Sequence, residues 1–116
     1  MMIETTAGVP MDSQLLSNYF KALVNRFFKI LPIREQGDES LVIYLESFQK
    51  ELLGCQALIT AIQNDALYVS LLATLQYLID HPDCSVKAVR RQVFNSISIC
   101  NKLKSIYAEQ LIDAQE

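Results

Sequence analysis

The sequence predicts an all-α protein, an antiparallel bundle of four helices. Apolar residues recur every three or four positions over four long stretches, which is the spacing of one helix face. The chain has only three glycines and three prolines, too few for the many turns of an all-β fold. Strand alternation and the dipeptides of β-hairpins are absent. At 116 residues, with 51 % apolar and 20 % charged residues, the chain fits a single domain over 1–116 with its own core.

The first helix is expected over residues 13–31. Asp12 or Ser13 can cap its free N–H groups, and Pro32 should end it by forcing Leu31 out of helical geometry. Adjacent apolar pairs recur four positions apart and keep one broad stripe on one side of the helix. These pairs are Leu15–Leu16, Tyr19–Phe20, Leu23–Val24 and Phe27–Phe28. Residues 1–11 are expected to form a loose arm.

The second helix is expected over residues 40–63, after a polar loop with Gly37 as its flexible point. Gly54 lies in its middle, where a glycine costs about 1 kcal/mol relative to alanine. Such a glycine most often lets another helix come close, or marks a kink. The third helix is expected over 66–80, because Asn64 and Asp65 can break the chain and cap a new helix. In the alternative, residues 40–80 form one continuous rod and the protein has three helices.

The fourth helix is expected over residues 85–111, after a hard stop at His81, Pro82 and Asp83. Its inward stripe repeats at three or four residues, and residues 112–116 are expected to fray. Four amphipathic helices with short connections pack most simply as an up-down bundle.

Charge and cysteine content exclude several classes of protein. The net charge of −3 gives no general attraction to nucleic acid or anionic membranes. The sequence has no stretch of about 18 apolar residues, which a membrane-spanning helix would need. The N-terminus lacks the pattern of a secretory signal. The three cysteines are odd in number and form no C-x-x-C pair, which favours reduced thiols and a cytoplasmic location.

No catalytic motif, cofactor motif or metal-ligand pattern occurs, so an enzyme is not predicted. His81 and Cys84 stand three residues apart with Asp80 and Asp83 beside them, and a thiol nucleophile needs such a base. They lie across a proline turn, however, where the spacing predicts no fixed geometry, so a solvated loop is favoured. With one histidine, a zinc site would need an unusual ligand set.

The last predicted helix carries a basic face. Lys87, Arg91, Asn95, Ser98 and Lys102 share one side, Arg90 lies beside it, and no acid occurs from 87 to 104. The third and fourth helices also have the outline of a helix-turn-helix. A nucleic-acid-binding module using Lys87, Arg90, Arg91 and Lys102 is therefore the alternative function. The acidic net charge and the ordinary need of a surface helix for a polar face disfavour it.

Aromatic residues suggest a protein-binding surface. Phe27 and Phe28 widen the apolar side of the first helix, and Phe94 falls off the inward stripe of its helix towards Arg90 and Arg91. Aromatic and arginine side chains together are typical of interaction hot spots, although a packed core whose rim includes Phe94 explains the same pattern. The favoured hypothesis is a non-enzymatic protein that acts through protein–protein contacts, with self-association as a homodimer as one form. In size and composition alone the chain resembles the small helical proteins common in bacterial and phage genomes.

Overall fold

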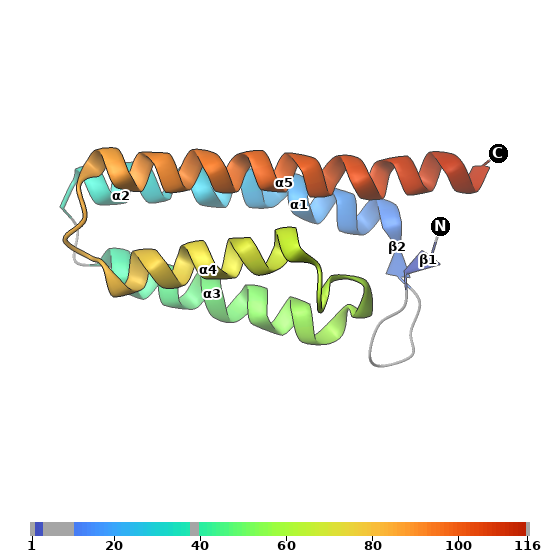
Figure 1. Cartoon of the computed structure of the whole chain (residues 1–116), viewed down its shortest axis with the longest axis horizontal. Coiled ribbons are helices and arrows are strands. Elements are labelled where there is room, and N and C mark those ends of the chain that lie inside the picture. The colour runs from blue at the N-terminus through green and yellow to red at the C-terminus, as the bar shows by residue number, and fades with distance from the viewer. Residues whose placement is uncertain (1, 4–10, 38–39, 116) are drawn as a thin grey trace.

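The computed structural model describes the backbone of residues 2–3, 11–37 and 40–115 and the side chains of residues 14–37, 40–60 and 62–108. In this part of the chain the predicted all-α fold with four helical stretches is confirmed (Figure 1). Successive stretches run antiparallel, and they form two layers, α1–α2 with α5 and α3 with α4. The helices are α1 (Ser13–Phe28), α2 (Ile30–Glu35), α3 (Ser40–Leu58), α4 (Ala66–Asp80) and α5 (Val86–Gln115).

Two very short strands precede the bundle. β1 (Met2–Ile3) pairs antiparallel with β2 (Met11–Asp12), with Met2 opposite Asp12 and Ile3 opposite Met11. They fall within or beside the stretch predicted as a loose arm, of which residues 1 and 4–10 lie outside the described residues. The chain then enters α1 directly at Ser13.

The predicted end of the first helix at Pro32 is wrong. The helix breaks earlier, in a turn at Lys29, and a second segment begins at Ile30. Pro32 is then the third residue of α2, where a helix N–H has no intrahelical partner and a proline is tolerated. The loop comes later, and Gly37 there has a φ of +64°, a conformation that glycine adopts without strain.

The predicted continuation of α3 to residue 63 is also wrong, because the helix ends at Leu58. Ile59 takes an extended conformation (φ −113°, ψ 107°) before the 3₁₀ turn η1 (Thr60–Ile62). This turn brings Ile62 into the core with no exposed surface. The side-chain amide of Gln63 donates to the Ala57 carbonyl oxygen, 3.3 Å away, and so satisfies a carbonyl at the helix end.

The predicted break at residues 64–65 is confirmed, and the continuous rod over 40–80 is excluded. The Asp65 carboxylate accepts hydrogen bonds from the backbone N–H groups of Leu67 (2.9 Å) and Tyr68 (3.3 Å). It is the N-cap of α4, which matches the predicted range 66–80. The Ser85 hydroxyl plays the same part for α5 by accepting from the Ala88 N–H (3.1 Å). α5 begins at Val86 as expected, and its backbone stays helical to Gln115 rather than 111.

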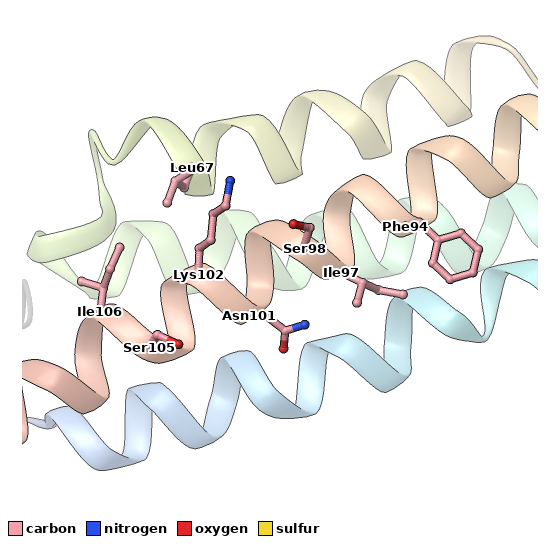
Figure 2. A pocket seen from close by; sticks show the side chains of 8 residues that line it. All are labelled: Leu67, Phe94, Ile97, Ser98, Asn101, Lys102, Ser105 and Ile106. Atoms are coloured by element: carbon pink, nitrogen blue, oxygen red, sulfur yellow. The ribbon is translucent and has the colours of Figure 1, made fainter.

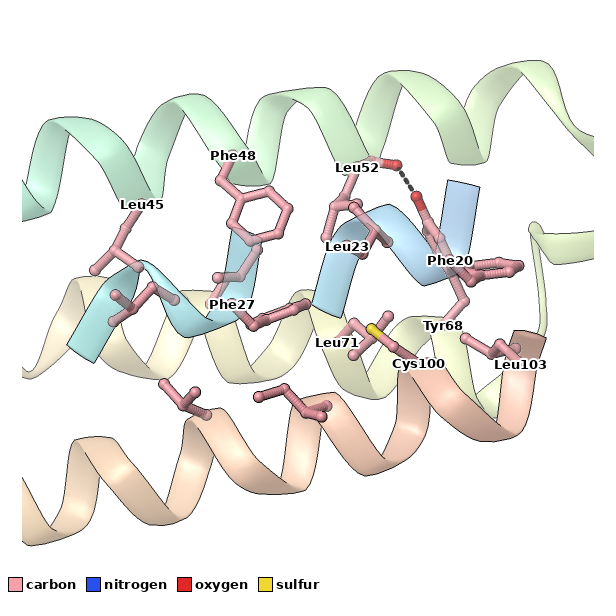
Figure 3. Close-up of a cluster of buried hydrophobic side chains, with 14 of the residues drawn as sticks. Phe20, Leu23, Phe27, Leu45, Phe48, Leu52, Tyr68, Leu71, Cys100 and Leu103 are labelled. Atoms are coloured by element: carbon pink, nitrogen blue, oxygen red, sulfur yellow. Dashed lines mark hydrogen bonds between the residues drawn. The ribbon is translucent and has the colours of Figure 1, made fainter. Parts of the chain in front are cut away.

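The core lies between the two layers and is built on aromatic rings (Figure 3). The Phe27 and Phe48 rings lie 4.8 Å apart between centroids, and Phe20 lies between the rings of Tyr68 and Tyr107. The Tyr68 hydroxyl donates to the Leu52 carbonyl oxygen, 2.6 Å away, and so joins α4 to α3. The sequence interpretation of Gly54 as a close-approach site within the bundle is wrong, since a Cβ there would meet nothing within 4 Å.

Candidate interaction surface

The surface that the sequence singled out lies on the solvent side of α5. One side of α5 contributes Val89, Val93, Cys100 and Leu103 to the core, so the opposite side faces water. Its exposed residues define what we call the α5 outer face. They are Lys87, Arg90, Arg91, Phe94, Asn95, Ser98, Asn101, Lys102, Ser105 and Ile106.

Two exposed phenylalanines meet at the edge of this face. Phe94 of α5 is 48 % exposed and Phe28 of α1 is 41 % exposed. Their rings pack edge to face, with centroids 5.9 Å apart and planes at 83°. The sequence nominated both residues, but only the packing of α1 against α5 brings them together. A partly exposed aromatic pair of this kind presents a rigid apolar anchor to a partner.

The prediction of Phe27 as a partner contact is wrong. Phe27 has no exposed surface and its ring packs on Phe48. Neighbouring residues on a helix point about 100° apart, so Phe27 faces the core while Phe28 faces the rim. An apolar pair in sequence could not tell which member would be outermost.

The basic residues of the α5 outer face are exposed, and Arg90 among them has an acidic partner. A guanidinium nitrogen of Arg90 lies 3.5 Å from a carboxylate oxygen of Glu35 in α2, and both side chains are about half exposed. An exposed pair of this kind contributes about 0–1 kcal/mol, so Arg90 can exchange Glu35 for another acidic group at little cost. Lys87, Arg91 and Lys102 are also exposed.

A shallow, open hollow runs along the α5 outer face (Figure 2). Its volume is about 650 Å³. Phe94 lies at one end, and Ile106 with Leu67 of α4 lies at the other. Ser98, Asn101 and Ser105 line the stretch between and offer hydroxyl and amide groups. The sequence did not nominate Leu67 or Ile106, since Leu67 belongs to the inward stripe of its own helix and no local signal places it beside α5.

Acidic residues are distributed unevenly among the helices. α1 and the part of α5 from Val86 to Ala108 contain no acidic residue, whereas α2, α3 and α4 carry Glu35, Glu46, Glu51 and Asp80. The basic residues of that acid-free part are Lys21, Arg26, Lys87, Arg90, Arg91, Lys102 and Lys104. Arg26 is ion-paired with Glu51 across the layers and lies over the Phe48 ring, 4.4 Å from its centroid. The α5 outer face is therefore locally basic although the whole chain is acidic.

The helix-turn-helix outline is not realised. In that motif the two helices cross at about 90–120°, whereas α4 and α5 run antiparallel, side by side (Figure 1). A helix held flat against its neighbour in this way does not project from the fold as a recognition helix does.

Burial holds the Cys55 and Cys100 thiols in their neutral form, and the His81 ring is held by Tyr77 of its neighbouring helix. The His81 ring stacks on Tyr77, with centroids 4.3 Å apart, and its Nδ1 lies 2.9 Å from the Tyr77 carbonyl oxygen. These contacts turn the ring towards α4. Burial raises the pKa of the Cys55 thiol and raises that of Cys100 to about 12. Both thiols are therefore protonated at neutral pH and weak as nucleophiles.

Among the described residues no group of three or more His, Cys, Asp or Glu side chains could hold a metal ion. In the same part of the chain no helix is long and apolar enough to cross a membrane. No protein-family model, curated protein or solved structure matches the chain.

Proposed function

We propose that this protein is a non-enzymatic docking module that binds a partner protein on the α5 outer face. The Phe28–Phe94 pair is the observation that carries the proposal. Both rings are 40–50 % exposed and held in a fixed edge-to-face contact, so a partner can bury them with little further loss of side-chain freedom. Arg90 and Arg91 precede Phe94 by one helical turn and complete the aromatic and arginine composition of a hot spot.

The charge of this surface favours an acidic partner segment. The α5 outer face has basic groups at Lys87, Arg91 and Lys102 and no acid, which attracts acidic chains and repels basic ones. The apolar ends of the hollow, Phe94 and Ile106, are 12 positions apart, or about 18 Å along α5. A partner helix of about three to four turns would reach both ends and place carboxylates between them. A cytoplasmic location agrees with this role, because Cys55, Cys84 and Cys100 are free thiols.

Photo-crosslinking tests the docking proposal. A photoreactive phenylalanine at position 94, introduced in cells that make the protein, should give an adduct with a discrete second protein. The matched control is the same group at Lys50, an exposed residue of α3, which should not give that adduct. Arg91→Glu should lower the yield at position 94. Equal adducts at both positions, or none at position 94, would refute the proposal.

A nucleic-acid-binding module remains the second candidate, and the observation that favours it is the lack of acidic residues in α1 and in residues 86–108 of α5. Its expected sign is weak, salt-sensitive binding of a labelled DNA duplex at about 50 mM salt, reduced by Arg91→Glu. Among the described helices none projects from the fold to enter a DNA groove, so sequence preference is not expected. If the chain at about 100 µM leaves the duplex free at this salt concentration, the candidate is rejected.

A further inference from the structure

A second exposed surface lies on the opposite layer, and it carries no charge. Leu53 (47 % exposed), Leu58 (56 %) and Val69 (45 %) leave large apolar side chains in water. From Leu52 to Ile79 the sequence has one charged residue, Asp65, and its carboxylate is occupied in capping α4. We call this surface the α3–α4 face, made of Leu53, Gly54, Ala57, Leu58, Val69 and Ala73.

These residues form one continuous surface. The hydrogen bond from the Tyr68 hydroxyl to the Leu52 carbonyl oxygen places the next residues, Leu53 and Val69, on neighbouring stretches of the two helices. Residues four apart lie on the same side of a helix, so Ala57 follows Leu53 along α3 and Ala73 follows Val69 along α4. By the same spacing Leu58 follows Gly54 and borders the face on the other side of Ala57. Contiguous exposed apolar surface of this kind marks an interaction site more often than scattered single residues do.

Gly54 lies within this face and has no role inside the bundle. Its φ is not positive, and a Cβ added there would meet nothing within 4 Å. A glycine in a helix interior costs about 1 kcal/mol relative to alanine. The open space over Gly54, between the exposed side chains of Leu53 and Leu58, lets the backbone of an external helix come close.

Charge decides which occupant fits. In a twofold dimer the same patch meets itself, and like charges placed opposite each other are destabilising. The α5 outer face would place Lys87, Arg91 and Lys102 against their own copies, so it is unsuited to self-association. The six residues of the α3–α4 face can meet their own copies without any such repulsion, and the charge next to them on this side of α3 is Lys50, one turn before Gly54.

The size of the face agrees with a weak dimer. α4 has 15 residues and is therefore about 22 Å long. Two packed helices about 10 Å apart present a width of about 20 Å. The whole outer side of the two helices over this length is then about 440 Å² per copy, or about 900 Å² for both, which is smaller than a stable interface and fits only a weak dimer.

We propose that the α3–α4 face is the interface of a twofold homodimer whose helices cross near Gly54. The two layers pack back to back through the core (Figure 1), so the α5 outer face stays open on each copy. The dimer is thus independent of the proposed docking function and would present two docking faces on opposite sides.

Sedimentation equilibrium of the full chain from about 1 to 200 µM tests this inference. The wild-type chain should be in monomer–dimer equilibrium in this range, and Leu58→Glu should raise the dissociation constant at least about tenfold. Phe94→Glu on the α5 outer face is the matched control and should leave the constant unchanged. Circular dichroism of each variant confirms that it is folded.

Gly54→Ala separates a fold defect from an interface defect. It should raise the unfolding temperature of the monomer, because alanine favours the helix, and at the same time weaken the dimer several-fold by closing the space at the crossing. A wild-type chain that is monomeric at 200 µM would overturn the inference. So would a dimer that Phe94→Glu disrupts and Leu58→Glu does not, a result that would leave the α5 outer face as the interface.

Discussion

The hydroxyl of Tyr68 offers a sensitive test of how α3 and α4 are held together. Tyr68 is fully buried and donates to the Leu52 carbonyl oxygen at 2.6 Å. Tyr68→Phe removes this bond but keeps the ring and its edge contact with Phe20 (6.2 Å between centroids). The Leu52 carbonyl oxygen keeps its place in the α3 ladder, so no buried acceptor is left without a partner. The expected loss in the free energy of unfolding is about 1 kcal/mol.

Tyr68→Ala removes the ring as well and should cost about 3–5 kcal/mol, because it leaves a cavity in the core. Urea denaturation at one fixed protein concentration measures both losses, and Tyr77→Phe on the outer side of α4 should change stability by less than about 0.5 kcal/mol. If Tyr68→Phe left the free energy of unfolding unchanged, the ring alone would account for the contribution of Tyr68 to stability. If it cost as much as Tyr68→Ala, the assumption that the ring packs unchanged without its hydroxyl would be wrong.

Three further changes test a helix cap, a glycine in a helix interior and a buried thiol. Asp65→Ala should cost about 1 kcal/mol in urea denaturation, since the N–H groups of Leu67 and Tyr68 lose their acceptor; no loss would mean that water replaces the cap. Gly54→Ala should stabilise the monomer by about 0.5–1 kcal/mol below the dimerising concentration, and destabilisation would imply a contact over that residue. Burial raises the pKa of Cys100 from 9.0 to about 12, so the folded chain keeps a proton there that the unfolded chain loses above pH 9. The free energy of unfolding should therefore fall as pH rises from 9 to 12. Cys100→Ala should make that fall shallower by about 1.4 kcal/mol per pH unit. An unchanged slope would show that the Cys100 thiol does not contribute to the pH dependence of stability.

The helix boundaries show where local sequence rules hold and where packing overrides them. The start of α4 at Ala66 follows from Asp65, because a cap is a local hydrogen bond between neighbours in sequence. The end of α3 does not follow from its neighbours, because the chain leaves the helix at Ile59 in order to bury Ile62. The prediction that Pro32 ends the first helix was wrong for a related reason. A proline stops a helix or sits in its first turn, and the break at Lys29, which no local signal marks, decides between the two.

The same distinction between local sequence rules and tertiary packing applies to the candidate site. Periodicity correctly placed Arg90, Arg91 and Phe94 on the exposed side of the last helix, since that depends only on the phase of one helix. It could not separate Phe27 from Phe28, because both lie on the wide apolar side of the first helix and only the positions of α3 and α5 decide which is covered. The α3–α4 face was not found either, because Leu53 and Leu58 stand beside the core residues Leu52 and Ile59, and local spacing does not show which of two apolar neighbours is exposed.

The sequence by itself determined the all-α class, the four helical stretches, the break before α4 and the acid-free stretch of α5. Each of these depends on residues close together in the chain, through helical period, capping and local charge. Only the tertiary structure decided which apolar residues face solvent, that Phe28 meets Phe94, and that the basic and uncharged surfaces lie on opposite layers. These features depend on how distant helices are positioned against one another, and the burial of Ile62, Tyr68 and Phe27 between the layers sets that arrangement.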